Sequence, residues 1–283
     1  MDTVQEFRYR SPRKVPGHRA GSHAATALGA GLEFVTHQSL YARPDPRRLD
    51  LRASIASVPF EWLVRVHRQR AAIAVHLLVD VSASMRFGTP GKLELVAQFA
   101  RALGASAWRV GDALGMVAFD RGERADLRVS AWRHRGMGET LAQLLLQSQG
   151  GAGGIEGLRE AATLLAGRSG IVFLVSDFHW PLAGLEQVLE LLSPAHVVPL
   201  VVWDPAEIEP PAQDGLALLR DAEGGGSRSF WLRPALRARW REAVQARRTG
   251  LDALFGRHDV RPFYLQGVFD AEALSHHLWE EAA

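Results

Sequence analysis

The residues of this chain that are best suited to bind a ligand are an aspartate and two serines that alternate along the sequence. Asp80, Ser82 and Ser84 directly follow a long apolar run, so a loop that leaves this run can direct three oxygen atoms at one point. A second apolar run is followed within two residues by Asp177. Carboxylates and hydroxyls without nitrogen or sulfur ligands form a hard oxygen donor set, which suits Mg²⁺ or Mn²⁺. The sequence therefore predicts a metal site formed by these four residues.

A simpler structural explanation exists for the same residues. A turn rich in serine can cap the helix that follows it, and Asp80 can then serve as the N-cap residue. The position of the motif favours the metal, because ligands of doubly wound sheets bind where the strands end, near the point at which the strand order reverses. Both explanations are compatible with the sequence.

The elements that must position these residues are strands that alternate with helices. The apolar runs before Asp80 and Asp177 are nearly continuous, which is typical of strands buried on both faces. The predicted buried strands are 73–79, 114–119, 171–175 and 197–203, with an edge strand at 126–131 and helices at 93–109, 139–147, 155–166 and 182–192. A hairpin (216–219 with 229–232), a long Arg-rich helix, a strand near Phe263 and a terminal helix (271–280) follow. This alternation predicts an α/β fold with a doubly wound, mostly parallel, Rossmann-like sheet.

The first 70 residues differ from the rest, and we interpret residues 1–70 as a basic, partly irregular N-terminal arm ahead of a domain that comprises 71–283. The arm holds 12 Lys and Arg but 6 Asp and Glu, whereas the remainder holds 21 and 25. Such an excess of positive charge can mark contact with nucleic acid or a membrane. The arm lacks aromatic residues interleaved with its arginines, so we expect protein contacts and no nucleic-acid binding.

Several function classes are excluded by what the chain lacks. It contains no cysteine, which rules out disulfides, thiolate metal sites and cysteine nucleophiles. No run of about 18 apolar residues occurs, and the start of the chain is charged, so we expect a cytoplasmic protein without a membrane span. Gly88-x-x-Gly91-Lys92 is too short for a phosphate-binding P-loop. Asp80-x-Ser82 lacks the second carboxylate that serves as the acid in phosphatases with an aspartyl nucleophile.

The motifs of the chain follow one another in an order that resembles a known family. Asp80-x-Ser82-x-Ser84 after the first buried strand is similar to the metal-ion-dependent adhesion site of von Willebrand factor A domains. The wider pattern resembles a von Willebrand factor A-like bacterial family of unknown function, usually encoded beside MoxR-type AAA+ ATPases. Its motifs here are Gly-Ala-Gly-Leu-Glu-Phe (29–34), Asp-Pro-Arg-Arg-Leu-Asp (45–50), Val-Arg-Val-His (64–67) and Leu-Val-Asp-Val-Ser-Ala-Ser-Met (78–85). Accessory proteins of methanol oxidation look similar in size and in lacking membrane spans.

The resemblance implies a role for each residue of the predicted site. Ser82 and Ser84 would bind the metal directly, while Asp80 and Asp177 would hold it through water or through the serine hydroxyls. One coordination position would stay open for a carboxylate from a protein partner.

The chain departs from the family at one metal ligand. The family uses a threonine in the loop before the fourth helix, where this chain reads Gly-Gly-Ala-Gly-Gly-Ile at 150–155. Thr140 lies too early in the sequence, and Ser148 is the nearest substitute. We therefore expect weak metal binding, or a water molecule in the place of the threonine.

From the site and from family analogy we expect a non-catalytic, metal-dependent adaptor. It would link a MoxR-type AAA+ ATPase to a client protein that offers an acidic side chain, and it would serve the maturation of that client or the insertion of its metal. Two alternatives stay open. One is a degenerate adaptor that binds through the basic arm without a metal, and the other is a metal-dependent hydrolase, for which the sequence places no base near Asp80.

Overall fold

The computed structural model describes residues 5–12, 20–29, 33–220, 222, 224 and 226–281. The chain divides into two compact units. The large unit comprises Met1–Pro12 and Ala74–Ala283, and the small unit comprises Arg13–Ile73. All four predicted metal ligands belong to the large unit.

A six-stranded sheet forms the centre of the large unit, in the order β11-β8-β7-β4-β5-β6. Its strands are β4 (Ala74–Asp80), β5 (Ala113–Phe119), β6 (Val129–Trp132), β7 (Ile171–Ser176), β8 (His196–Trp203) and β11 (Phe263–Gln266). All neighbouring strands are parallel except β5 and β6, which pair antiparallel. The strand order reverses between β4 and β7, which confirms the predicted α/β class with a doubly wound, mostly parallel sheet.

Both faces of the central strands are covered, which explains their continuous apolar runs. β7 is buried at every position, and in β4, β5 and β8 only the first residue is partly exposed. Near the end of β4, Val79 pairs with Ala118 of β5 on one side and Val175 of β7 on the other. The ends of these three strands therefore meet at one edge of the sheet, where the candidate site lies.

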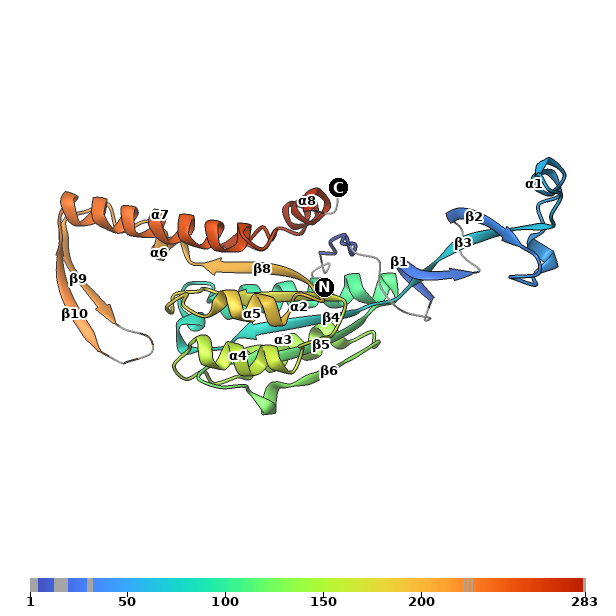
Figure 1. Cartoon of the computed structure of the whole chain (residues 1–283). Coiled ribbons are helices and arrows are strands. Elements are labelled where there is room, and N and C mark those ends of the chain that lie inside the picture. The colour runs from blue at the N-terminus through green and yellow to red at the C-terminus, as the bar shows by residue number, and fades with distance from the viewer. Residues whose placement is uncertain are drawn as a thin grey trace. The chain divides into compact units, whose positions relative to one another are not determined.

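Helices cover both faces of the sheet (Figure 1). They include α2 (Lys92–Val110), α3 (Met137–Gln147), α4 (Ile155–Thr163), α5 (Leu185–Leu191) and α7 (Pro234–Gly256). One buried cluster joins Leu78 and Leu174 to α4, α5 and the last turns of α7. On the opposite face, Phe173 of β7 packs against Phe99 of α2 and against Phe7. The alternation of side chains along β7 separates these two cores.

A hairpin and two further helices complete the large unit (Figure 1). The short helix α6 (Pro205–Ile208) follows β8, the hairpin of β9 (Gly215–Arg220) and β10 (Ser227–Leu232) leads into α7, and α8 (Ala271–Glu281) comes after β11. The hairpin, the Arg-rich helix, the strand near Phe263 and the terminal helix are all present, as predicted.

The small unit contains a three-stranded antiparallel sheet in the order β1-β3-β2, with one short helix. Its elements are β1 (Ala20–Gly29), β2 (Glu33–Ser39), α1 (Leu51–Ala56) and β3 (Leu63–Ala71). Much of the arm that was predicted to be partly irregular is therefore a β-sheet. Its pairings contain register shifts, as β-bulges produce.

The start of the described chain also differs from the predicted arm, because residues 5–12 pack with the large unit. Phe7 is buried, and its ring stacks on Phe99 with centroids 5.7 Å apart. The hydroxyl of Tyr9 donates to Asp112 Oδ2 at 2.8 Å. These contacts anchor the segment, so the arm as a structural unit begins later than predicted.

Candidate functional site

Four neighbouring parallel strands each deliver an aspartate to the same edge of the sheet. Asp80 is the last residue of β4, and Asp120, Asp177 and Asp204 directly follow β5, β7 and β8. Asp120 and Asp204 were not predicted as site residues, although the same signal precedes them, an apolar run that ends in aspartate. The edge therefore concentrates more negative charge than the sequence pattern of two strands indicated.

Asp80 is completely buried, and its carboxylate accepts hydrogen bonds from neutral donors. Oδ1 accepts from the backbone N–H of Ser82 at 2.9 Å, and Oδ2 accepts from the Ser176 hydroxyl at 2.7 Å and the Trp180 indole N–H at 3.2 Å. Burial, together with the negative charge of Asp177, raises the pKa of Asp80 to about 6. No ion pair reaches Asp80 from any residue that the structure describes. Buried charges are normally paired with an opposite charge or coordinate a metal. An ionised Asp80 would therefore require a positive partner that the described residues do not supply.

The hydroxyls of Ser82 and Ser84 lie side by side, with their oxygens 3.2 Å apart. Ser82 is buried and Ser84 is half-buried, so the pair opens to solvent through Ser84. The turn that follows is a short 3₁₀ helix whose N-cap residue is Ser82, and no side chain caps it. The explanation of Asp80 as a helix N-cap is therefore wrong, and the three residues form an oxygen-rich turn at the end of β4.

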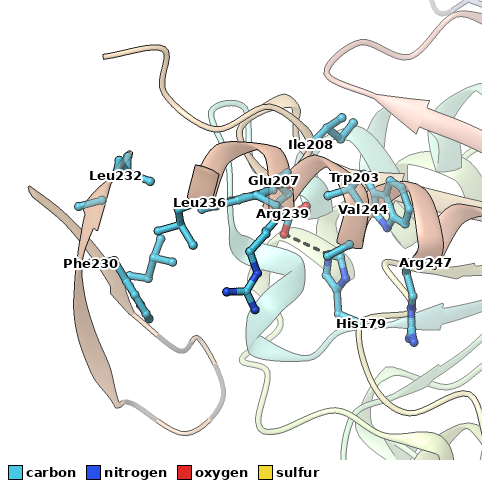
Figure 2. A pocket seen from close by; sticks show the side chains of 14 residues that line it. His179, Trp203, Glu207, Ile208, Phe230, Leu232, Leu236, Arg239, Val244 and Arg247 are labelled. Carbon is cyan, nitrogen blue, oxygen red and sulfur yellow. Dashed lines mark hydrogen bonds and ion pairs between the residues drawn. The ribbon is translucent and has the colours of Figure 1, made fainter. Parts of the chain in front are cut away.

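A buried lysine that was not predicted as a site residue binds the second carboxylate. Lys92 Nζ donates to Asp177 Oδ2 at 2.6 Å and to Glu207 Oε1 at 2.8 Å. Burial alone would raise the pKa of Asp177, but the positive charge of Lys92 keeps it below its ordinary value. His179 Nε2 lies 3.4 Å from Glu207 Oε1 (Figure 2). Ligand atoms of Asp177, His179 and Glu207 lie within 4.8 Å of one another, but a metal ion there would have to displace the ammonium from two of them.

The loop before α2 fixes the position of this lysine. Gly88 has a φ of 107°, and a Cβ atom there would lie 2.3 Å from Asp204 Oδ2, so only glycine fits against the start of α6. The backbone turns back through a bridge between Gly88 and Gly91, and Lys92 is the first residue of α2. A positive charge is unfavourable at a helix N-terminus. The ion pair with Asp177 compensates for the unfavourable interaction of the ammonium with the helix dipole.

The backbone that separates Asp177 from His179 is strained. Phe178 has a φ of 51°, which is uncommon for a residue other than glycine. Its N–H donates to Ser176 Oγ at 2.9 Å, the same hydroxyl that donates to Asp80. Such strained residues concentrate at functional sites. Here the turn brings Asp177 and His179 to the same cluster of charged groups.

The glycine loop in which the family threonine is missing packs directly on the serine turn. Gly151 accepts a hydrogen bond from Ala83 N at 2.8 Å and donates from its own N–H to Asp120 Oδ2 at 3.2 Å. A Cβ atom at Gly150 would lie 1.9 Å from the carbonyl oxygen of Val81. The backbone approach at Gly150 therefore leaves no room for a side chain.

Both hydroxyls considered in place of the threonine donate hydrogen bonds to backbone carbonyls. Ser148 Oγ donates to the Leu145 carbonyl at 2.7 Å, and Thr140 Oγ1 donates to the Gly136 carbonyl at 3.2 Å. Both bonds satisfy the backbone of α3 and its ends.

The structure brings the four predicted ligands to one edge, but in two different electrostatic states. Asp80, Ser82 and Ser84 share one turn that offers oxygen donors and lacks positive charge, which fits a small divalent cation. Asp177 lies on the neighbouring strand, close enough for its charge to act on Asp80, yet Lys92 already neutralises it. The donor set therefore fits a divalent cation at the serine turn, with Asp177 in a supporting position.

Three known proteins are similar to parts of this chain. The uncharacterised protein Rv1480 of Mycobacterium tuberculosis is 27% identical over 241 residues, which cover 83% of this chain and 75% of that protein. Among solved structures, an aerotolerance-related membrane protein from Bacteroides fragilis has 15% identity and a TM-score of 0.45, over 75% of this chain and 98% of that one. The mussel byssus protein PTMP1, solved with a zinc-occupied MIDAS motif, has 16% identity and a TM-score of 0.36, over 46% of this chain and 38% of that one.

Within the part of the chain that the structure describes, no helix is both long and apolar enough to cross a membrane. A family model, described as a protein of unknown function, DUF58, matches residues 45–250. The match includes residues 45–73 of the small unit and the whole edge that carries the four aspartates. The chain therefore belongs to the DUF58 family of proteins of unknown function.

Proposed function

We propose that the protein is a non-catalytic docking module that uses a divalent cation, Mg²⁺ or Mn²⁺, to bind an acidic side chain of a protein partner. The observation that carries this proposal is the environment of Asp80, a completely buried carboxylate that has neutral hydrogen-bond donors and no ion pair among the described residues. An ionised carboxylate in such a place is costly unless a positive charge is near. A divalent cation would supply that charge.

The residues of the serine turn have distinct parts in this proposal. Ser82 and Ser84 would hold the cation through their adjacent hydroxyls, and Asp80 would support it from the buried side. Ser176 and Trp180 keep the Asp80 carboxylate in place through their hydrogen bonds. When bound, the cation supplies a coordination position for a carboxylate. Because Ser84 is half-buried, that position can face an incoming partner.

The partners proposed for this module come from the family resemblance. A MoxR-type AAA+ ATPase and a client protein with an acidic side chain would meet on it, in the maturation of the client or the insertion of its metal. The site supports the chemistry of the client contact alone. The part of the surface that the ATPase would use has no assignment in this proposal.

A metal-dependent hydrolase is the second candidate, and His179 favours it. The side chain of His179 is 41% exposed and contacts Glu207, a pairing that suits a general base. Ser84 and His179 also line the same cavity. If the protein hydrolysed a substrate at this site, replacing His179 by Asn would abolish hydrolysis. A docking module would keep its partner binding in the same variant.

Thermal unfolding of the whole chain with titrated Mg²⁺ and Mn²⁺ tests the proposed cation. A ligand that binds only the folded state adds about 2.7 kcal/mol of stability at a hundredfold excess over its dissociation constant. We expect wild type to gain stability at millimolar metal, and Asp80→Asn and Ser82→Ala to lose that gain. Ser130→Ala removes an exposed hydroxyl of β6 and serves as the control. The absence of any gain in wild type would contradict the proposal and favour the degenerate adaptor.

A further inference from the structure

An apolar groove lies between the β9–β10 hairpin and α7 (Figure 2). Its volume is about 640 Å³, which is in the range of pockets that bind ligands in proteins. Apolar side chains dominate the lining, among them Leu219, Phe230, Leu236 and Val244. A continuation of the cavity along the hairpin is lined by Ser84, so the groove and the proposed docking position are contiguous.

The hairpin has apolar side chains on both faces, which is unusual for a ribbon in water. Leu219 and Phe230 line the groove, and their strand neighbours point the other way. Leu216, Leu218 and Trp231 are 70%, 67% and 57% exposed, and the two leucines line the adjoining cavity that Ser84 also lines. A two-stranded hairpin is marginal by itself and needs an apolar surface against it. Exposed apolar patches of this kind mark sites of protein contact.

The charge around the groove defines the kind of partner. Residues 215–250 contain 8 arginines, no lysine and 3 acidic residues. Arg237 and Arg241 are paired with acidic residues of the preceding loop. Arg239 is exposed and has no ion pair among the described residues, and it extends from α7 into the groove (Figure 2). The groove therefore combines an apolar floor with an available positive charge.

We propose that this groove docks an acidic amphipathic segment of a protein partner. Its apolar side chains would occupy the space between Leu219 and Val244, and its carboxylates would face Arg239. A second copy of this chain would bring arginine against arginine, and a nucleic acid offers no apolar face to the lining. Arginine and aromatic residues also dominate the energetics of protein interfaces. The groove contact does not require the cation, although one partner could use both.

Fluorescence anisotropy with synthetic peptides tests the proposal on the whole chain. The probe is a fluorescein-labelled amphipathic peptide with leucines on one helical face and glutamates on the other. One control peptide has serine in place of each leucine, and another has lysine in place of each glutamate. We expect the acidic amphipathic peptide to bind at least about tenfold more tightly than either control, because it alone matches both the lining and the charge.

Two pairs of variants locate the binding. Leu219→Ser should weaken the acidic peptide about tenfold, as expected for a lost leucine contact, whereas Leu146→Ser on α3 should not. The two leucines are 42% and 41% exposed, so neither change is expected to unfold the chain. Arg239→Glu should weaken the acidic peptide and strengthen the lysine peptide, and the exposed Arg135→Glu should change neither.

Repeating the titrations in EDTA separates this groove from the metal site. Binding that survives EDTA and Ser82→Ala but is lost in Leu219→Ser supports the groove, even if the cation proposal fails. Binding that is lost in EDTA and unchanged in Leu219→Ser and Arg239→Glu overturns the groove and leaves the cation proposal intact. A preference for the lysine peptide in wild type would also overturn the groove proposal.

Discussion

Replacing Lys92 by methionine tests the electrostatic structure of the site most directly. The substitution keeps much of the length of the side chain and removes the ammonium that pairs with Asp177 at 2.6 Å and Glu207 at 2.8 Å. The side chain of Lys92 is fully buried, that of Asp177 is 1% exposed and that of Glu207 is 19% exposed. The charges that remain would therefore be poorly hydrated.

The expected cost follows from this burial. Removing one partner of a buried ion pair leaves an uncompensated charge and typically costs about 3–5 kcal/mol of folding free energy. Arg101→Met on the same helix is the matched control, because Arg101 pairs with Glu139 at 2.7 Å but both side chains are about one third or more exposed. An exposed pair of this kind contributes about 0–1 kcal/mol. Urea unfolding followed by circular dichroism at neutral pH measures both values.

The double variant Lys92→Met/Asp177→Asn makes the result specific to charge. It removes one uncompensated carboxylate, so part of the lost stability should return relative to Lys92→Met. If Lys92→Met lost less than about 1 kcal/mol, the ammonium would not be the counter-ion of this cluster and the reasoning would be refuted. The reasoning would also be refuted if Asp177→Asn lowered the stability of the Lys92→Met variant further instead of restoring part of it.

Three further predictions concern positions outside the ion-pair cluster. Burial lowers the pKa of His76 to about 4, so the unfolded chain binds the proton more readily than the folded chain. The free energy of unfolding should therefore fall by about 1.4 kcal/mol per pH unit as the pH drops from about 6.5 to 4. Urea unfolding of His76→Leu across this range should lack this pH-dependent loss. Gly150→Ala should lower the melting temperature because its Cβ would lie 1.9 Å from the Val81 carbonyl, whereas Gly154→Ala, with nothing within 4 Å, should have little effect. Phe7→Ala should cost about 3–5 kcal/mol in urea unfolding, because this ring belongs to the core of the large unit; a loss below about 1 kcal/mol would contradict that assignment.

The sequence predicted the central sheet well because its strands are buried on both faces. Each strand is then nearly continuously apolar, as in the first five residues of Ile171–Ser176, and length and composition suffice to identify it. The sheet of the small unit was not predicted, because β1 consists mostly of small residues, which give little contrast between apolar and polar positions. Phe7 and Tyr9 alternate with charged residues and both are buried, but two aromatic residues form too short a pattern to predict their burial from sequence.

The candidate site was predictable where its residues are close in sequence. Asp80, Ser82 and Ser84 share one turn, and local spacing was enough to group them. Lys92 is 85 residues from Asp177 and 115 from Glu207, and a single sequence does not reveal such long-range pairing. One compositional signal was present, because Lys92 is one of two lysines in a chain with 31 arginines. The ammonium of lysine is a compact charge on a flexible stem, which allows Lys92 to contact Asp177 and Glu207 at once.

The close approach of the glycine loop to the serine turn also limits how this site can change during evolution. At Gly150 any side chain would collide with the Val81 carbonyl, so a substitution there is tolerated only if the backbone of both segments moves together. At Gly151 the nearest atom to an added Cβ is Asp120 Oδ2 at 3.6 Å, an ordinary contact. A lineage could therefore gain a loop hydroxyl in one step at position 151, whereas position 150 would require coordinated changes. Whether related proteins acquire a loop hydroxyl at this site would therefore depend on the order of mutations as well as on their chemistry.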